Sequence, residues 1–189
     1  MPLTTLDSRP ALVVIDLQKG IISGPVEAAV PSAAALATAF RQHDLPVILV
    51  NVTGRAPGRT DADGRGGHGG IRGGIRALPE GWADIIDELE RQPADYLITK
   101  RRRSAFHDTG LDTLLRDLGV TQVVLAGVST SSGVESSARS AHDHGYHVVL
   151  AADAMADPDP ESHRHSLERI FPKLGETATS AEIIGFLDR

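Results

Sequence analysis

Four short segments of this 189-residue chain are apolar along almost their whole length, and a fifth is similar; this pattern restricts the fold more than any other feature. Strands buried on both faces of a parallel sheet have such continuous apolar sequences, whereas strands with one solvated face alternate. Four of the segments are rich in β-branched residues, and the fifth, 95–100, is weaker. The expected strands are 11–17, 46–52, 95–100, 121–128 and 147–154.

Helical patterns lie between these segments. We expect helices over 26–42, 81–91, 108–119, 133–145, 160–171 and 179–187, the last with Ser180 as its N-cap. Alternation of strands and helices predicts an α/β fold with an open, doubly wound sheet and right-handed crossovers. The length suits one domain with a full core, so we expect a single domain over residues 1–189.

Residues 53–80 break the alternation. Glycine and arginine dominate this segment, which has no hydrophobic period. Long connections without regular structure are usually lids, binding loops or disordered segments. Three interpretations stay open for it: an exposed mobile loop, a lid whose arginines contact a ligand, and a contact for RNA.

Composition excludes several function classes. The absence of cysteine excludes thiol catalysis, disulfides and thiolate metal sites. A net charge of −6 argues against a nucleic-acid-binding surface. The sequence begins without the basic and apolar regions of a signal peptide, and no apolar segment reaches the length of a membrane span. We therefore expect a cytoplasmic protein with a small-molecule partner and neither nucleic acid nor membrane as a partner.

Polar residues collect where the predicted strands end. In open parallel sheets, ligands bind outside the carboxyl ends of the strands. The residues predicted at those ends include an acid, a base and a turn of glycine and serine, which together favour a small-molecule site. They are Asp16, Gln18, Asn51, Lys100, Asp153 and the loop 127–133.

Three motifs resemble the isochorismatase-like hydrolase family, which includes nicotinamidases and other cysteine amidases. "LVVIDLQKGI" contains Asp16 at the family's aspartate position, and "ITKRRRSAFHDTGLDTLL" contains Lys100 at the family's lysine position. "VVLAGVSTSSGVESSARSAHDHGYHVVLAADAMAD" is similar to the family's nucleophile segment and its continuation, and "ESH" at 161–163 resembles a later Glu-x-His. The likeness spans nearly the whole chain in the family's order.

This resemblance implies a three-layer α/β/α sandwich, Rossmann-like, on a six-stranded, mainly parallel sheet, and a homo-oligomer such as a dimer or tetramer. It places Gly133 where the amidases have their nucleophilic cysteine, and true isochorismatases also have glycine there. The sequence departs from those enzymes in two ways: Ser131 and Ser132 replace their His-Ile, and no aromatic residue follows Asp16.

The resemblance also assigns the site. It implies a cis peptide bond before Ser129 that turns the N–H groups of Ser129 and Gly133 toward one point, as an oxyanion or anion pocket. Asp16, Lys100 and Gly133 are the expected catalytic positions. The expected substrate-binding residues are Gln18, Phe106, Val128, Ser129 and Ser132.

No cofactor and no metal is expected. His142 and His144 are two residues apart on a predicted helix and so do not share a face, and His147 opens a strand. His68 lacks the Asp-x-His partners that the nicotinamidases use for metal. Arg101, Arg102 and Arg103 are expected to be solvated, with the alternative that one of them faces the pocket and pairs with a carboxylate.

Without a nucleophile at Gly133, the chemistry expected is hydrolysis of a small anionic vinyl ether of the isochorismate type, with Asp16 as general acid and no covalent intermediate. A free aspartate has a pKa near 3.9 and a nearby lysine lowers it further. The acid role therefore requires burial of Asp16 or an anionic substrate that offsets Lys100. Two alternatives stay open: an amidase that uses Ser132 as nucleophile, and a binding or scaffold protein without catalysis.

Overall fold

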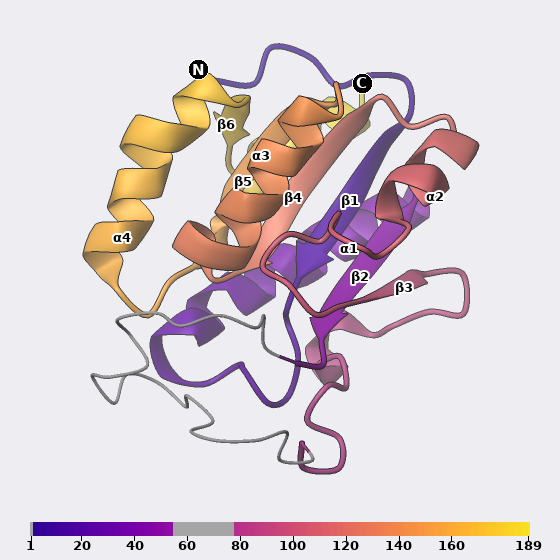
Figure 1. The fold of residues 1–189 in the computed structure, drawn as a ribbon. Helices are drawn as coiled ribbons and strands as arrows, with labels where there is room; N and C mark the ends of the chain where they lie inside the picture. Colours follow the sequence, from indigo (N-terminus) through magenta and orange to yellow (C-terminus); the bar gives the residue numbers. More distant parts are fainter. Residues whose placement is uncertain (1, 55–77) are drawn as a thin grey trace.

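The computed structural model describes residues 2–54 and 78–189. Its centre is a six-stranded sheet in the order β3-β2-β1-β4-β5-β6, and every neighbouring pair is parallel (Figure 1). The strands are β1 (Pro10–Ile15), β2 (Val47–Val52), β3 (Tyr96–Lys100), β4 (Gln122–Val128), β5 (His147–Ala156) and β6 (Glu176–Ala178).

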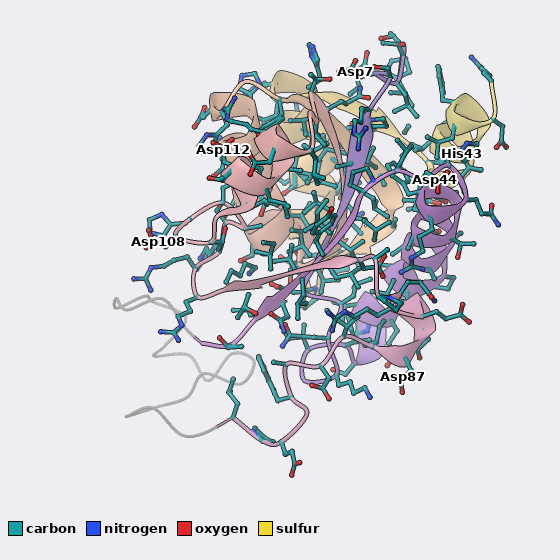
Figure 2. The ribbon with its side chains drawn as sticks, turned by 90° about the vertical axis from the view of Figure 1, so that its right-hand side faces the viewer. Asp7, His43, Asp44, Asp87, Asp108 and Asp112 are labelled. Atoms are coloured by element: carbon teal, nitrogen blue, oxygen red, sulfur yellow. The ribbon has the colours of Figure 1, made fainter. Side chains whose placement is uncertain are left out.

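Helices cover both faces of this sheet. Figure 1 shows α2, α3 and α4 in front of the strands and α1 behind them. In the turned view of Figure 2, Asp112 on α2 and His43 at the end of α1 lie on opposite sides. The three-layer α/β/α sandwich is therefore confirmed. The helices are α1 (Val30–Gln42), α2 (Leu111–Asp117), α3 (Glu135–Asp143), α4 (Pro160–His165) and α5 (Ser180–Leu187).

Burial on both faces explains the continuous apolar segments. Alternate residues of β1 point into separate apolar layers: Leu12 packs in the layer that contains Phe40 of α1, and Ile15 packs in the layer that contains Leu111 of α2. All six residues of β1 are buried. A strand with no solvated face has no position at which a polar residue is favoured, and β1, β2, β4 and β5 lie close to their expected bounds. Burial on both faces does not hold for β3, an edge strand in which Tyr96 and Leu97 are exposed.

The strand order places a topological switch point beside β1. The chain adds β2 and β3 on one side of β1 and then crosses to add β4, β5 and β6 on the other. The crevice between the carboxyl ends of β1 and β4 is where this architecture binds ligands. Asp16 directly follows β1 there, and a π-helical turn, Thr130–Val134, lies beyond the end of β4.

The helix expected over 81–91 is wrong. The structure has turns there and a single 3-10 turn, Asp87–Leu89. The backbone instead pairs with the segment after β1: the amide of Ile86 donates to the carbonyl of Leu17, and Gln18 forms an antiparallel bridge with Ile85. The spacing of Ile86 and Leu89, both buried, imitates a helical period although the backbone hydrogen bonds go elsewhere.

Two details at the C-terminal end also differ from expectation. Thr179, not Ser180, caps α5: its side chain accepts from the amide of Glu182, whose side chain bonds back to the backbone of Thr179. The amide and hydroxyl of Ser180 both donate to the carboxylate of Asp153 instead. The strand β6 has no apolar segment of its own, because it is three residues long and only Ala178 is buried.

The other expected helices are present with shorter bounds. The segment 26–42 divides into a 3-10 turn, Gly24–Ala29, and α1, and the segment 160–171 ends in a π-helical turn, Ser166–Ile170. Residues 55–77 lie outside the described residues. They make up most of the segment 53–80, so its three interpretations stay predictions. Within residues 2–54 and 78–189, every helix is too short or too polar to span a bilayer.

Gly127 supplies a test of this packing. It pairs with Ile15 across β1 and β4 at φ +111°, and a Cβ there would stand 2.0 Å from the carbonyl oxygen of Ile15. Gly127→Ala is expected to lower the free energy of unfolding by at least about 3 kcal/mol, because the strands must separate. Gly119→Ala is the matched control: its φ is +69° with open space around it, so only backbone strain of about 1–2 kcal/mol applies. Equal decreases in the free energy of unfolding of the two variants, measured by urea denaturation, would contradict this account.

Candidate functional site

A buried ion pair lies at the switch point. The Nζ of Lys100 is 2.7 Å from Oδ2 of Asp16, and the two residues are only 3% and 6% exposed. Asp16 comes from the end of β1 and Lys100 from the end of β3, so β2 lies between their strands. Asp16 adopts a left-handed backbone (φ +53°) while its amide donates to the carbonyl of Val50. The chain thus turns sharply at Asp16 and holds its carboxylate among buried groups.

Burial dominates the electrostatics of this pair. Loss of water raises the pKa of the Asp16 carboxyl to about 6, although the charge of Lys100 and its hydrogen bond oppose the rise. At pH 7 a carboxyl with this pKa is protonated in about one molecule in ten, against about one in a thousand for a free aspartate. The other oxygen, Oδ1, is buried and has no hydrogen-bond partner among the described residues. The pair therefore provides a carboxyl that can exist as an acid near neutral pH.

Gly133 faces this carboxylate. A Cβ on Gly133 would lie 3.4 Å from Oδ2 of Asp16, 3.1 Å from Cγ2 of Ile15 and 3.2 Å from the carbonyl oxygen of Val128. Gly133 belongs to the π-helical turn Thr130–Val134, directly before α3. The position at which the resemblance expects the nucleophile of the amidases is therefore adjacent to the carboxylate, and here it has no side chain.

The segment before Gly133 contains the cis peptide bond that the resemblance implies. A cis peptide bond joins Val128 to Ser129. The carbonyl of Ser129 accepts hydrogen bonds from the amides of Ser132 (3.1 Å) and Val134 (3.2 Å), which lie on either side of Gly133. Val128 is fully buried. The backbone thus places Ser129 and Gly133 in one tight turn beside the ion pair.

One buried hydroxyl joins this turn to the loop after β3. The hydroxyl of Ser137 donates to the carbonyl of Gly133 (2.7 Å) and accepts from the amide of Ala105 (2.9 Å), and Ser137 has no exposed surface. Ser137 was not among the predicted site residues. Its spacing of four residues from Gly133 is the signal that could have found it, since a serine in a helix often bonds back to that carbonyl.

Two further contacts hold the other side of the turn. The carboxylate of Asp157, just beyond β5, accepts from both the amide (2.8 Å) and the hydroxyl (2.7 Å) of Ser131. The hydroxyl of Thr130 lies 2.8 Å from Nδ1 of His163, the histidine of the "ESH" motif in α4. Asp157 and His163 thus support the turn, and no hydrogen bond within the described part of the chain joins them to the ion pair.

Not every predicted site residue comes close to the pair. The side-chain amide of Gln18 bonds to the amide and carbonyl of Val52 and to the carbonyl of Trp82, so its polar atoms serve the fold. The ring of Phe106 stacks on His144 at 5.4 Å and lies 6.0 Å from the ring of Tyr146, the residue directly before β5, at the amino end of that strand. These contacts do not place Phe106 beside Asp16.

The hydroxyl of Ser132 has a single partner among the described residues, Nη1 of Arg103 at 3.4 Å. Asp153 is bound by Ser180 and Ser32 and serves the fold. Among residues 2–54 and 78–189, no three His, Cys, Asp or Glu side chains lie close enough together to hold a metal ion. His68 lies outside the described residues.

Comparison with known proteins agrees with this geometry. The family model for the isochorismatase domain matches residues 10–182. The chain is 38% identical to the isochorismatase family protein YwoC of Bacillus subtilis, over 93% of each chain. It is 30% identical to the maleamate amidohydrolase of Pseudomonas putida, over 90% of this chain and 83% of that protein.

A solved structure supports the same assignment. An isochorismatase family protein from Burkholderia thailandensis superposes with a TM-score of 0.84 at 36% identity, and the match covers 98% of both chains. The matched region includes the buried Asp16–Lys100 pair and the turn around Gly133. The chain therefore belongs to the isochorismatase family of hydrolases.

Proposed function

We propose that this hydrolase cleaves a small anionic vinyl ether of the isochorismate type without forming a covalent intermediate. One observation carries the proposal: the buried Asp16 carboxyl, with its pKa raised to about 6, faces a glycine where a nucleophile would otherwise stand. A covalent route requires a nucleophile activated by a base, and glycine has none to offer. Acid catalysis requires only a proton donor and a water molecule.

The reaction follows from these groups. Asp16 transfers its proton to the terminal carbon of the vinyl ether, which leaves an oxocarbenium ion and a carboxylate on Asp16. Water adds to the cationic carbon and gives up a proton, which restores the acid. The resulting hemiketal breaks its C–O bond to release pyruvate and an alcohol. All atoms of the substrate and one water are accounted for, and no bond to the protein forms.

Lys100 has a separate part in this scheme. When Asp16 has given up its proton, the ammonium 2.7 Å away stabilises the carboxylate that remains. It therefore stabilises the charge state that follows proton transfer, and it holds the carboxylate in place beside Gly133. A buried charge without its partner is strongly unfavourable, so the two residues function as one unit.

An amide substrate is the alternative, favoured by the name of the Pseudomonas putida amidohydrolase. In this chain it would use Ser132 as nucleophile. The one hydrogen bond of that hydroxyl among the described residues is to Arg103, which is not a base. A scaffold role without catalysis is the third hypothesis, and the retention of both charges at a buried site argues against it, since an unused buried pair could be replaced by apolar residues without loss of stability.

The pKa of Asp16 tests the electrostatic basis of the proposal. In the ligand-free protein, the carboxyl carbon of Asp16 should titrate near pH 6 in a carbon-detected NMR experiment, with Asp16→Asn used to assign the signal. Lys100→Met should raise this pKa above 6, because the ammonium lowers it. A titration midpoint near pH 4 in the parent protein would contradict the account, and so would a lower pKa of Asp16 in Lys100→Met.

Turnover tests the reaction itself. We expect release of pyruvate from isochorismate, measured with lactate dehydrogenase, and a loss of about 10²–10⁴-fold in kcat for Asp16→Asn, which cannot donate the proton. The value of kcat/KM should fall about tenfold for each pH unit above 6, because the acid form is lost. A Ser132 amidase with Asp16 as base would have the opposite pH dependence, with kcat/KM falling below pH 6. It would also leave an acyl adduct in intact-mass spectra. Such an adduct, or equal activity in Asp16→Asn, would overturn the proposal.

Gly133→Ala tests whether the substrate uses the space beside Asp16, because it fills this space with little effect on stability. The new methyl group would stand 3.1–3.4 Å from its three neighbours, which need to shift only slightly, while alanine favours the helical backbone by about 1 kcal/mol. The free energy of unfolding should therefore change by no more than about 1 kcal/mol. Turnover should fall more than tenfold because the methyl group occupies the space facing the carboxyl. Full activity in this variant would show that the substrate does not approach Asp16 from Gly133.

A further inference from the structure

Arg103 connects the two walls of the site. It follows Lys100 in the loop after β3, and its Nη1 lies 3.4 Å from the hydroxyl of Ser132 in the turn after β4. In the same loop, the carbonyl of Arg102 accepts a hydrogen bond from Nζ of Lys100 (3.2 Å), so the loop is in direct contact with the ion pair. The guanidinium is therefore held beside the residue that precedes Gly133.

Arg103 forms no salt bridge within residues 2–54 and 78–189. Asp16 and Lys100 neutralise each other, whereas no carboxylate of the described ranges lies within 4.0 Å of Arg103. The side chain is exposed, so it is available to a ligand. Its only described partner, Ser132, is a hydroxyl that can donate to an anion from the same side. A guanidinium and a hydroxyl together match the two oxygens of a carboxylate.

We propose that Arg103, with Ser132, binds the carboxylate of the substrate and so selects vinyl ethers that bear this group on the double bond. This inference rests on the proposed function, and it adds the part of the substrate that the site recognises. Ser132 precedes Gly133 directly, and the Cβ position of Gly133 is 3.4 Å from Asp16. The anion site and the proton donor are thus close, as a substrate requires when its carboxylate is attached to the carbon–carbon double bond.

The test measures binding apart from turnover. Pyruvate carries the same carboxylate next to an sp² carbon, and pyruvamide is its neutral counterpart. Isothermal titration calorimetry at low ionic strength should detect binding of pyruvate to the parent chain. The parent chain should bind pyruvamide at least tenfold more weakly. Arg103→Met should weaken pyruvate binding tenfold or more and leave pyruvamide unchanged. Arg101→Met, which removes a neighbouring exposed arginine of the same loop, is the matched control and should change neither value by more than twofold.

Each result bears on the proposal. Pyruvate binding that is unchanged in Arg103→Met, or lost equally in Arg101→Met, would overturn it, and so would the absence of pyruvate binding to the parent chain. With isochorismate, Arg103→Met should raise KM at least tenfold and change kcat little, because the anion contact is the same in the ground and transition states. If Arg103→Met loses pyruvate binding but the parent chain does not cleave isochorismate, the carboxylate site stands and the proposed reaction fails.

Discussion

The burial of one acid beside one base is the constraint on which the rest of this structure depends. Removing Asp16 and Lys100 from water is unfavourable, and their mutual attraction offsets this only while the two atoms stay in contact at 2.7 Å. The fold provides that contact because β1 and β3 end at the same edge of the sheet with β2 between them. The same burial raises the pKa of Asp16, so the unfavourable free energy of burying the charge and the high pKa of the carboxyl have one cause.

The turn around Gly133 is specified by its neighbours more than by its own residues. Ser137, Asp157 and His163 come from three different segments, and each bonds to a different residue of the turn. Their contacts fix the main chain beside Asp16 from both sides while leaving the Gly133 position without a side chain. In such a site, a substitution at position 133 can change the chemistry, because the contacts that hold the turn use the main chain of Gly133 and not its side chain.

Most of the sheet could be predicted from the sequence because strands buried on both faces have a direct apolar signature, as β1 illustrates, whereas the short β6 has none. The motifs predicted a site around Asp16, Lys100 and Gly133, and the structure brings Lys100 and Gly133 close to Asp16. The segment 81–91 failed because its backbone hydrogen bonds go to residues 17–20, and a helical spacing of buried residues does not reveal such partners. The contacts of Phe106 with His144 and of Gln18 with Trp82 could not be predicted, because the direction of a side chain depends on tertiary contacts that no local pattern contains.

Gln18 has a consequence for how this architecture can diversify. Its single amide group bonds to Val52, the last residue of β2, and to Trp82 in the long connection between β2 and β3. These two points of the chain are therefore fastened to the same side chain, two residues after Asp16. The entropy of closing a chain grows slowly, by about 0.6 kcal/mol for each doubling of its length. Insertions and deletions between these two anchors would thus leave the sheet intact, and this connection is where the architecture can acquire new substrate preferences without being destabilised.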